Sequence, residues 1–182
     1  MTVEVDNNNH RTNTKYLMLK KFRMYMQEAK RWIVGLSTTK LVVFALMSTY
    51  LAVLPLFLYT PFAPPGQALG GPDLGKHDIL KMILLGCIAA PLIETAIIQW
   101  GCLRLLRKLH CKTGLAICIS ALIFGLGHAY SAPYVILGTL VGAILALVFV
   151  IEDGRKGYPF LATLAVHALR NGITAALTLA VF

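Results

Sequence analysis

The chain has 182 residues, of which 57% are hydrophobic and 14% are charged, and its formal net charge is +9. An ordinary soluble domain carries about 25% charged residues. Several apolar runs here reach the roughly 20 residues that a helix needs to cross a bilayer. The composition therefore excludes a soluble globular domain, and the length suits a single domain.

The positive charge is concentrated before the first apolar run and in two short loops, 104–112 and 152–157. An excess of Lys and Arg in cytoplasmic loops sets membrane orientation. The charge therefore predicts topology, and we expect no binding to nucleic acid. The cysteines lack the CxxC spacing of a structural zinc site and do not indicate a disulfide framework; they are Cys87, Cys102, Cys111 and Cys118.

The N-terminal region, residues 1–31, is predicted to be a polar and basic cytoplasmic or interfacial segment before a membrane domain of residues 32–182. Residues 1–14 are polar, so we expect them to be unstructured. Between Lys15 and Trp32, apolar residues mix with Lys and Arg, which predicts a basic amphipathic helix on an anionic lipid surface. A solvated cytoplasmic tail explains the same pattern equally well.

Five apolar runs predict five transmembrane helices, separated by loops rich in Pro, Gly or charge. They cover about residues 41–59, 79–103, 113–129, 134–151 and 158–182. The predicted fold class is all-α, a polytopic transmembrane bundle of about five spans with a basic amphipathic N-terminal helix. Basic segments on the cytoplasmic side would place the N-terminus in the cytoplasm and the C-terminus outside.

Few ionisable residues fall inside these runs. Each costs roughly 2.5–3.5 kcal/mol on insertion scales, so each is by default a functional hypothesis. Glu94 is the acid well inside a run, His128 and His167 are the histidines, and Arg170 is the basic residue.

Spacing along the helices predicts that the polar residues converge. Three pairs stand four residues apart and therefore share a helix face: Thr95 and Gln99 beside Glu94, Phe124 and His128, and His167 and Asn171. Burying these groups singly in lipid would be costly, whereas a common cavity satisfies them. We therefore expect Glu94, His128 and His167 to lie within hydrogen-bonding or one-water distance.

The predicted position of His128 in the membrane does not match the depth of Glu94 and His167. At about 1.5 Å per residue, it lies about 10 Å farther from the cytoplasmic end of its run than Glu94 and His167 lie from theirs. Either the third helix begins deeper than Thr113, or the third and fourth helices form a short hairpin.

The residue types indicate hydrolysis. A carboxylate beside an imidazole can hold and deprotonate a water, and a second imidazole with an amide can donate hydrogen bonds to an oxyanion. These groups suffice for peptide hydrolysis without a covalent intermediate. Alternatively, Glu94, His128 and His167 could bind a divalent metal such as zinc with an open water position. The HExxH spacing of soluble zinc proteases is absent.

The motifs resemble the CPBP family of intramembrane proteases, which includes type II CAAX prenyl endopeptidases and bacteriocin-processing, Abi-like or immunity proteins. That family carries EExxxR, commonly after Ala-Pro, then FxxxH, then HxxxN or HxxxB. The matching segments are Glu94 to Gln99 after Ala90 and Pro91, then Phe124 to His128, then His167 to Asn171. The resemblance covers roughly residues 79–175. It implies that Glu94 and His128 activate water, while His167 and Asn171 form the oxyanion site.

The chain departs from the family pattern at two positions. Thr95 stands in place of the second Glu and Gln99 in place of the Arg. This neutral pair can still form a hydrogen bond at its spacing, and Glu94 is kept, so the departure bears on the substrate more than on activity. Arg170 could pair with Glu94 or serve structure, and the sequence does not decide.

The sequence predicts an intramembrane endopeptidase of the glutamic or metallo type, acting on a peptide or lipidated-protein substrate in the membrane. Two other functions use the same residues. One is a non-catalytic membrane immunity or peptide-binding protein with the same polar cavity. The other is a small transporter or proton relay, which predicts internal repeats, and the sequence shows none.

Overall fold

The structure is a computed structural model, which describes residues 4–62 and 78–181. The described residues form helices and contain no strand, which confirms the all-α fold class. The chain divides into two compact units, the first ending at Ser37 and the second beginning at Thr38.

The first unit contains one helix, α1, which runs Glu4–Val34. The helix is longer than predicted, because residues 4–14 are helical and not unstructured; residues 1–3 lie outside the described part. Once a helix has formed, each added residue gains a backbone hydrogen bond without a new nucleation cost. The polar residues before Lys15 therefore extend the predicted helix. Large apolar side chains along it are exposed, among them Leu17, Phe22 and Met24.

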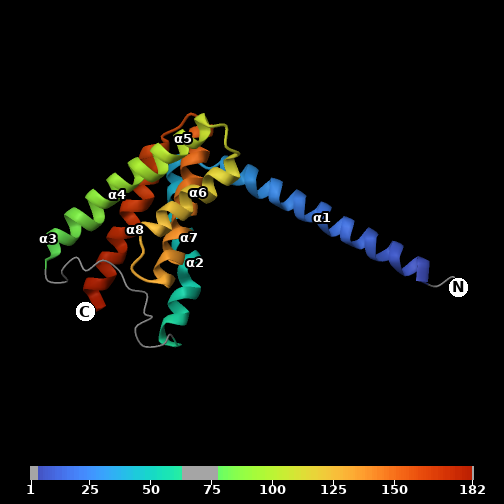
Figure 1. The fold of residues 1–182 in the computed structure, drawn as a ribbon, viewed down its shortest axis with the longest axis horizontal. Coiled ribbons are helices and arrows are strands. Elements are labelled where there is room, and N and C mark those ends of the chain that lie inside the picture. The colour runs from blue at the N-terminus through green and yellow to red at the C-terminus, as the bar shows by residue number, and fades with distance from the viewer. Residues whose placement is uncertain (1–3, 63–77, 182) are drawn as a thin grey trace. The chain divides into compact units, whose positions relative to one another are not determined.

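The second unit contains the membrane helices (Figure 1). In chain order they are α2 (Thr38–Tyr59), followed by the short η1 (Thr60–Phe62), a helix from Ile79 to Lys108, α6 (Thr113–Leu126), α7 (Ala132–Gly154) and α8 (Pro159–Val181). The predicted boundaries hold within a few residues, with one larger extension. The second helix continues to Lys108 because basic residues favour the last turn of a helix.

The helix from Ile79 to Lys108 alternates between α-helical and wider π-helical turns. The α-helical parts are α3 (Ile79–Lys81), α4 (Ala90–Glu94) and α5 (Leu103–Lys108), and the π-helical parts are η2 (Met82–Ala89) and η3 (Thr95–Cys102). Figure 1 shows them as one unbroken helix. π-Helical turns are frequent at functional sites, and Glu94 lies at the junction of α4 and η3.

Four helices are long and apolar enough to cross a membrane, namely Thr38–Leu56, Ile79–Lys108, Ala132–Gly154 and Pro159–Ala180. The predicted third span is shorter than expected: α6 has 14 residues and ends at Leu126 and not near Ala129. At 1.5 Å per residue it measures about 21 Å. Of the two explanations for the depth of His128, a start beyond Thr113 is not observed, and only one helix of the proposed hairpin is short, since α7 has 23 residues.

The packing is centred on α7, which contacts α2, α6 and α8, while α8 also contacts α2 and the helix from Ile79 to Lys108. Val53, Leu145 and Val166 lie fully buried between these helices. Many other large apolar side chains are exposed, as expected where lipid tails are as apolar as the protein interior.

Glycines let α6 and α7 approach closely. A Cβ atom at Gly125 would lie 2.1 Å from Thr139 Oγ1, and one at Gly142 would lie 2.8 Å from Phe124 Cβ. Small residues at such interfaces allow two backbones to come together. The contact fixes Phe124, and with it the end of α6, which His128 follows.

Glu152 ties three helix ends together and is fully buried. Its carboxylate accepts hydrogen bonds from Arg155, including Nε at 3.2 Å, and from the backbone N–H of Tyr158 at 3.1 Å. Arg155 also donates to Thr38 Oγ1 at 3.2 Å. The sequence analysis placed only Glu94 well inside a run. It missed Glu152, which lies one residue beyond the predicted end of the fourth run.

Candidate functional site

The three motifs meet at Glu94. Nε2 of His128 and Nε2 of His167 each lie 3.6 Å from Oε2 of Glu94. Glu94 ends α4, His128 follows α6, and His167 lies in α8. The predicted convergence of one carboxylate and two imidazoles, carried by three helices, is therefore observed.

The cluster is open on one side. The side chains of Glu94 and His128 are 28% and 20% exposed, whereas that of His167 is 3% exposed. Oε2 of Glu94 is itself buried and has no hydrogen-bond partner among the described residues. Glu94 therefore keeps acceptor capacity that another molecule can use.

His128 is oriented by Phe124. Its Nδ1 lies 2.7 Å from the carbonyl oxygen of Phe124. A carbonyl oxygen only accepts, so Nδ1 carries the proton of the neutral ring and Nε2 presents its lone pair toward Glu94. The Phe124 ring also stacks on His128 with centroids 4.6 Å apart and meets His167 edge-on at 5.3 Å. Phe124 thus supports both imidazoles.

His167 is oriented by Thr95, whose Oγ1 lies 3.4 Å from Nδ1. Thr95 is fully buried, and a buried hydroxyl needs an acceptor for its proton. Donation to Nδ1 supplies that acceptor and leaves the proton of neutral His167 on Nε2. The two imidazoles therefore present opposite groups to Glu94: a lone pair from His128 and an N–H from His167.

The hydrogen bond that the spacing allows between Thr95 and Gln99 does not form. Oε1 of Gln99 accepts from Ser120 Oγ at 3.1 Å, and Nε2 of Gln99 is buried without a partner in the described part of the chain. Both residues lie in η3 and are fully buried, but they contact different neighbouring helices: Thr95 faces His167 of α8 and Gln99 faces Ser120 of α6. Gln99 therefore joins η3 to α6, and Thr95 serves His167.

Asn171 bonds a neighbouring helix. Its Nδ2 donates to the carbonyl oxygen of Gly86 at 2.9 Å, and Gly86 lies about two turns before Glu94 in the same helix. Among the described residues, no hydrogen bond joins Asn171 to Glu94 or His128. One of its two amide N–H groups joins α8 to η2, and the other remains for another acceptor.

Arg170 does not pair with Glu94. Within residues 4–62 and 78–181 its guanidinium forms no ion pair, and its Nε is buried without a hydrogen-bond partner. The guanidinium carbon lies over the ring of Tyr50, 5.8 Å from its centroid. The hydroxyl of Tyr50 donates to the backbone oxygen of Arg170 at 2.9 Å.

Tyr134 borders the cluster, although sequence reasoning did not select it. Its ring centroid lies 6.0 Å from that of His128, and it interacts electrostatically with both Arg170 and Glu94. A tyrosine at the start of a span is typical of an interfacial anchor, so the sequence carries no signal that separates Tyr134 from such anchors.

The metal hypothesis named Glu94, His128 and His167 as ligands for a divalent ion such as zinc. In the described ranges, no group of three or more His, Cys, Asp or Glu side chains is arranged to hold a metal ion. No step proposed below passes through a metal ion.

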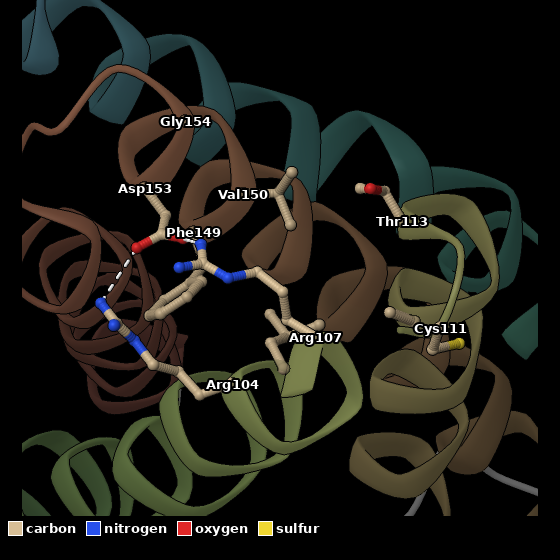
Figure 2. Close-up of a pocket in the computed structure, with 10 residues that line it drawn as sticks. Arg104, Arg107, Cys111, Thr113, Phe149, Val150, Asp153 and Gly154 are labelled. Atoms are coloured by element: carbon tan, nitrogen blue, oxygen red, sulfur yellow. Dashed lines mark hydrogen bonds and ion pairs between the residues drawn. The ribbon is translucent and has the colours of Figure 1, made fainter. Parts of the chain in front are cut away.

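A second polar region lies at the other end of these helices. A cavity of about 190 Å³ lies among α5, α6 and α7. Figure 2 shows Arg104 and Arg107 of α5 reaching Asp153 of α7, and Nη2 of Arg104 lies 3.0 Å from Oδ1 of Asp153. None of the predicted site residues lines this cavity, so we regard it as part of the packing of the helix ends.

Comparison with known proteins gives one family. The family model described as "Type II CAAX prenyl endopeptidase Rce1-like" matches residues 76–173, which is more than half of the chain and includes all three motifs. No curated protein and no solved structure matches the chain.

Proposed function

Because the chain belongs to the Rce1-like family of type II CAAX prenyl endopeptidases, we propose that it is an intramembrane endopeptidase for a membrane-associated or peptide substrate. The family match confirms the resemblance stated from the motifs. With four long apolar helices, the chain is an integral membrane protein of a CAAX-protease type. The observation that carries the proposal is the pair of 3.6 Å approaches of His128 and His167 to Glu94.

In the proposed mechanism, a water held by Glu94 and the lone pair of His128 attacks the carbonyl carbon of the scissile bond. Glu94 takes a proton from the water as the carbon–oxygen bond forms, which is general base catalysis. The carbonyl oxygen becomes an oxyanion, and the Nε2–H of His167 donates to it. The free N–H of Asn171 is the second proposed donor to this oxyanion.

The tetrahedral intermediate then collapses. Glu94 returns its proton to the departing nitrogen as the carbon–nitrogen bond breaks, so the products are an acid and an amine. No acyl-enzyme forms, because no side chain attacks the substrate. Phe124 and Thr95 hold the two imidazoles in the required tautomers, and they act on the reaction only through those rings.

We propose that the N-terminus is cytoplasmic and the C-terminus lies outside. Two contacts support a common basic end of the bundle: Arg107 with Asp153, and Arg155 with Thr38. They bring together the end of α5, the end of α7 with the residue that follows it, and the start of α2. Basic segments favour the cytoplasmic side. The basic residues and exposed apolar side chains of α1 support contact with anionic lipid.

The test is cleavage of a farnesylated peptide ending in a CAAX sequence, by protein in membranes at matched expression. Wild type is compared with Glu94→Gln and His128→Ala, and with Glu28→Gln as a matched control on the exposed face of α1. We expect cleavage by wild type and Glu28→Gln and none by the other two. Equal cleavage by all four proteins would contradict the proposal. Binding of the peptide by wild type without turnover would favour the non-catalytic peptide-binding alternative.

A further inference from the structure

Arg170 differs from the other arginines of the membrane unit that the structure describes. Those arginines each pair with an acid: Arg104 and Arg107 with Asp153, and Arg155 with Glu152. Arg170 lies near the middle of α8, forms no ion pair with a described residue, and has a buried Nε without a hydrogen-bond partner. A cation left unpaired inside a membrane span marks a functional site. Arg170 therefore needs an anion that this part of the chain does not supply.

Arg170 lies one turn after a member of the cleavage cluster, His167, in α8. Arg170 interacts electrostatically with His167, one turn earlier in α8, and with Tyr134, which itself interacts with Glu94. Arg170 also lies over the ring of Tyr50, which attracts the cation without neutralising it. The charge is thus supported, held beside the reacting groups and free to bind.

The backbone at this position is also held. Tyr50 donates to the carbonyl oxygen of Arg170 at 2.9 Å, and its hydroxyl lies 3.4 Å from Thr174 Oγ1 one turn later in α8. Tyr50 thereby joins α2 to α8 at the point where the guanidinium leaves the helix. A fixed backbone reduces the ordering cost of binding a ligand.

We propose that Arg170 binds the free C-terminal carboxylate of the substrate peptide. This inference rests on the proposed function and names the substrate end that the site reads. A planar guanidinium matches a carboxylate through two parallel N–H···O bonds, and a CAAX sequence ends the chain that carries it. This carboxylate is the anionic partner that Arg170 lacks among the described residues.

The spacing on α8 fits a bond close to the C-terminus. Arg170 lies three residues after His167, a rise of about 4.5 Å along the helix, and its side chain extends the reach. An extended peptide covers roughly 3.3–3.6 Å per residue. A carboxylate held by Arg170 therefore places a bond only a few residues from the C-terminus at Glu94.

The experiment compares two peptides of identical sequence and lipidation, one ending in a carboxylate and the other in a carboxamide. Wild type should favour the carboxylate on the order of 10- to 100-fold in kcat/KM, the effect of hydrogen bonds to a charged group. Arg170→Gln should lose this preference, mainly through a higher KM for the carboxylate peptide. Arg170→Lys keeps the charge without the planar fork, and its preference should be intermediate.

Arg107→Gln is the matched control, because it removes a positive charge from an exposed side chain outside the site and leaves Arg104 to pair with Asp153. It should keep the wild-type preference. Equal cleavage of both peptides by wild type would overturn the proposal, as would an undiminished preference in a folded Arg170→Gln protein.

Binding separates this inference from the proposed function. In the Glu94→Gln background, tighter binding of the carboxylate peptide should persist, and it should disappear when Arg170→Gln is added. If wild type cleaves neither peptide but binds the carboxylate form selectively through Arg170, the protease proposal fails and the carboxylate site stands. If wild type and Glu94→Gln each bind the carboxylate and carboxamide peptides equally well, the carboxylate-site proposal is wrong whether or not cleavage occurs.

Discussion

Glu94 and Glu152 are both acids on helices of the membrane unit, yet their surroundings differ. Glu152 is fully buried, and its carboxylate accepts from Arg155 and from the backbone of Tyr158. Glu94 is partly exposed, faces two imidazoles at 3.6 Å, and has one oxygen without a hydrogen-bond partner among the described residues.

The difference separates a carboxylate that stabilises from one that can react. Glu152 is paired with Arg155, and an arginine keeps its charge at every working pH. The carboxylate of Glu152 accepts its hydrogen bonds from other residues of the fold. Glu94 is paired with groups that can take up and release protons, and it keeps an oxygen for another molecule. Polar groups left unsatisfied in an otherwise consistent structure are expected where function resides.

The largest expected effect is on the reaction at Glu94. Replacement by Gln keeps the size of the side chain but removes the base, so we expect the cleavage rate to fall about 10³-fold. The thermal unfolding midpoint should stay near that of wild type, because Glu94 is partly exposed and forms no pair with an arginine or lysine that the structure describes. Initial rates and unfolding curves from one preparation measure both. A rate within tenfold of wild type would rule out Glu94 as the base.

Glu152→Gln should show the opposite pattern. Removing one partner of a buried ion pair leaves Arg155 uncompensated, and we expect the folded state to lose about 3 kcal/mol. The cleavage rate per folded molecule should change less than about twofold, since Glu152 makes no contact with the site. Asp153→Asn is the control, because its partners Arg104 and Arg107 are exposed and such pairs contribute about 0–1 kcal/mol. Equal unfolding midpoints for the two variants would contradict the structural role of Glu152.

Gly125→Ala tests whether the position of His128 depends on close packing of α6 and α7. The new Cβ would lie 2.1 Å from Thr139 Oγ1 and 2.7 Å from the carbonyl oxygen of Val135. The backbone contact cannot be relieved by a rotamer change, so we expect a loss of about 2 kcal/mol in stability and a reduced rate as His128 shifts. Gly114→Ala is the control, since nothing lies within 4 Å of its Cβ position. Identical behaviour of the two variants would show that the packing is not tight.

Thr95→Val should have a smaller effect, confined to the reaction. Valine has nearly the same shape but cannot donate to Nδ1 of His167, so the Nε2–H tautomer loses its support. We expect kcat to fall roughly tenfold with little change in KM. Thr95→Ser keeps the hydroxyl and should restore most of the rate. If Ser and Val are equally slow, the hydroxyl does not set the tautomer.

Metal removal is expected to have the smallest effect. The described side chains form no group arranged to hold a metal ion, so incubation with EDTA or 1,10-phenanthroline should leave the cleavage rate unchanged. The measurement is the rate before and after chelation, followed by addition of zinc. Loss of activity that zinc restores would overturn the metal-free mechanism and make Glu94, His128 and His167 the first candidate ligands.

The convergence of Glu94, His128 and His167 was predictable because apolar runs mark membrane helices and ionisable residues inside them are few. The details that the sequence did not predict depend on contacts that spacing does not encode. Thr95 contacts His167 of α8 while Gln99 bonds Ser120 of α6, and Asn171 bonds Gly86 across two helices. The position of the Tyr134 ring near His128 depends on where α7 begins. The burial of Glu152 follows from three helix ends meeting, which no local pattern reveals.

The length of α6 has a consequence for the surrounding lipid. Its 14 residues measure about 21 Å, whereas the hydrocarbon core of a bilayer is about 30 Å thick. Hydrophobic mismatch of this kind is relieved by local thinning of the bilayer or by flanking polar groups that reach the headgroups. Either response brings the aqueous phase closer to the end of the helix that His128 follows. The short helix would therefore also shorten the route by which water, a reactant in hydrolysis, enters the membrane.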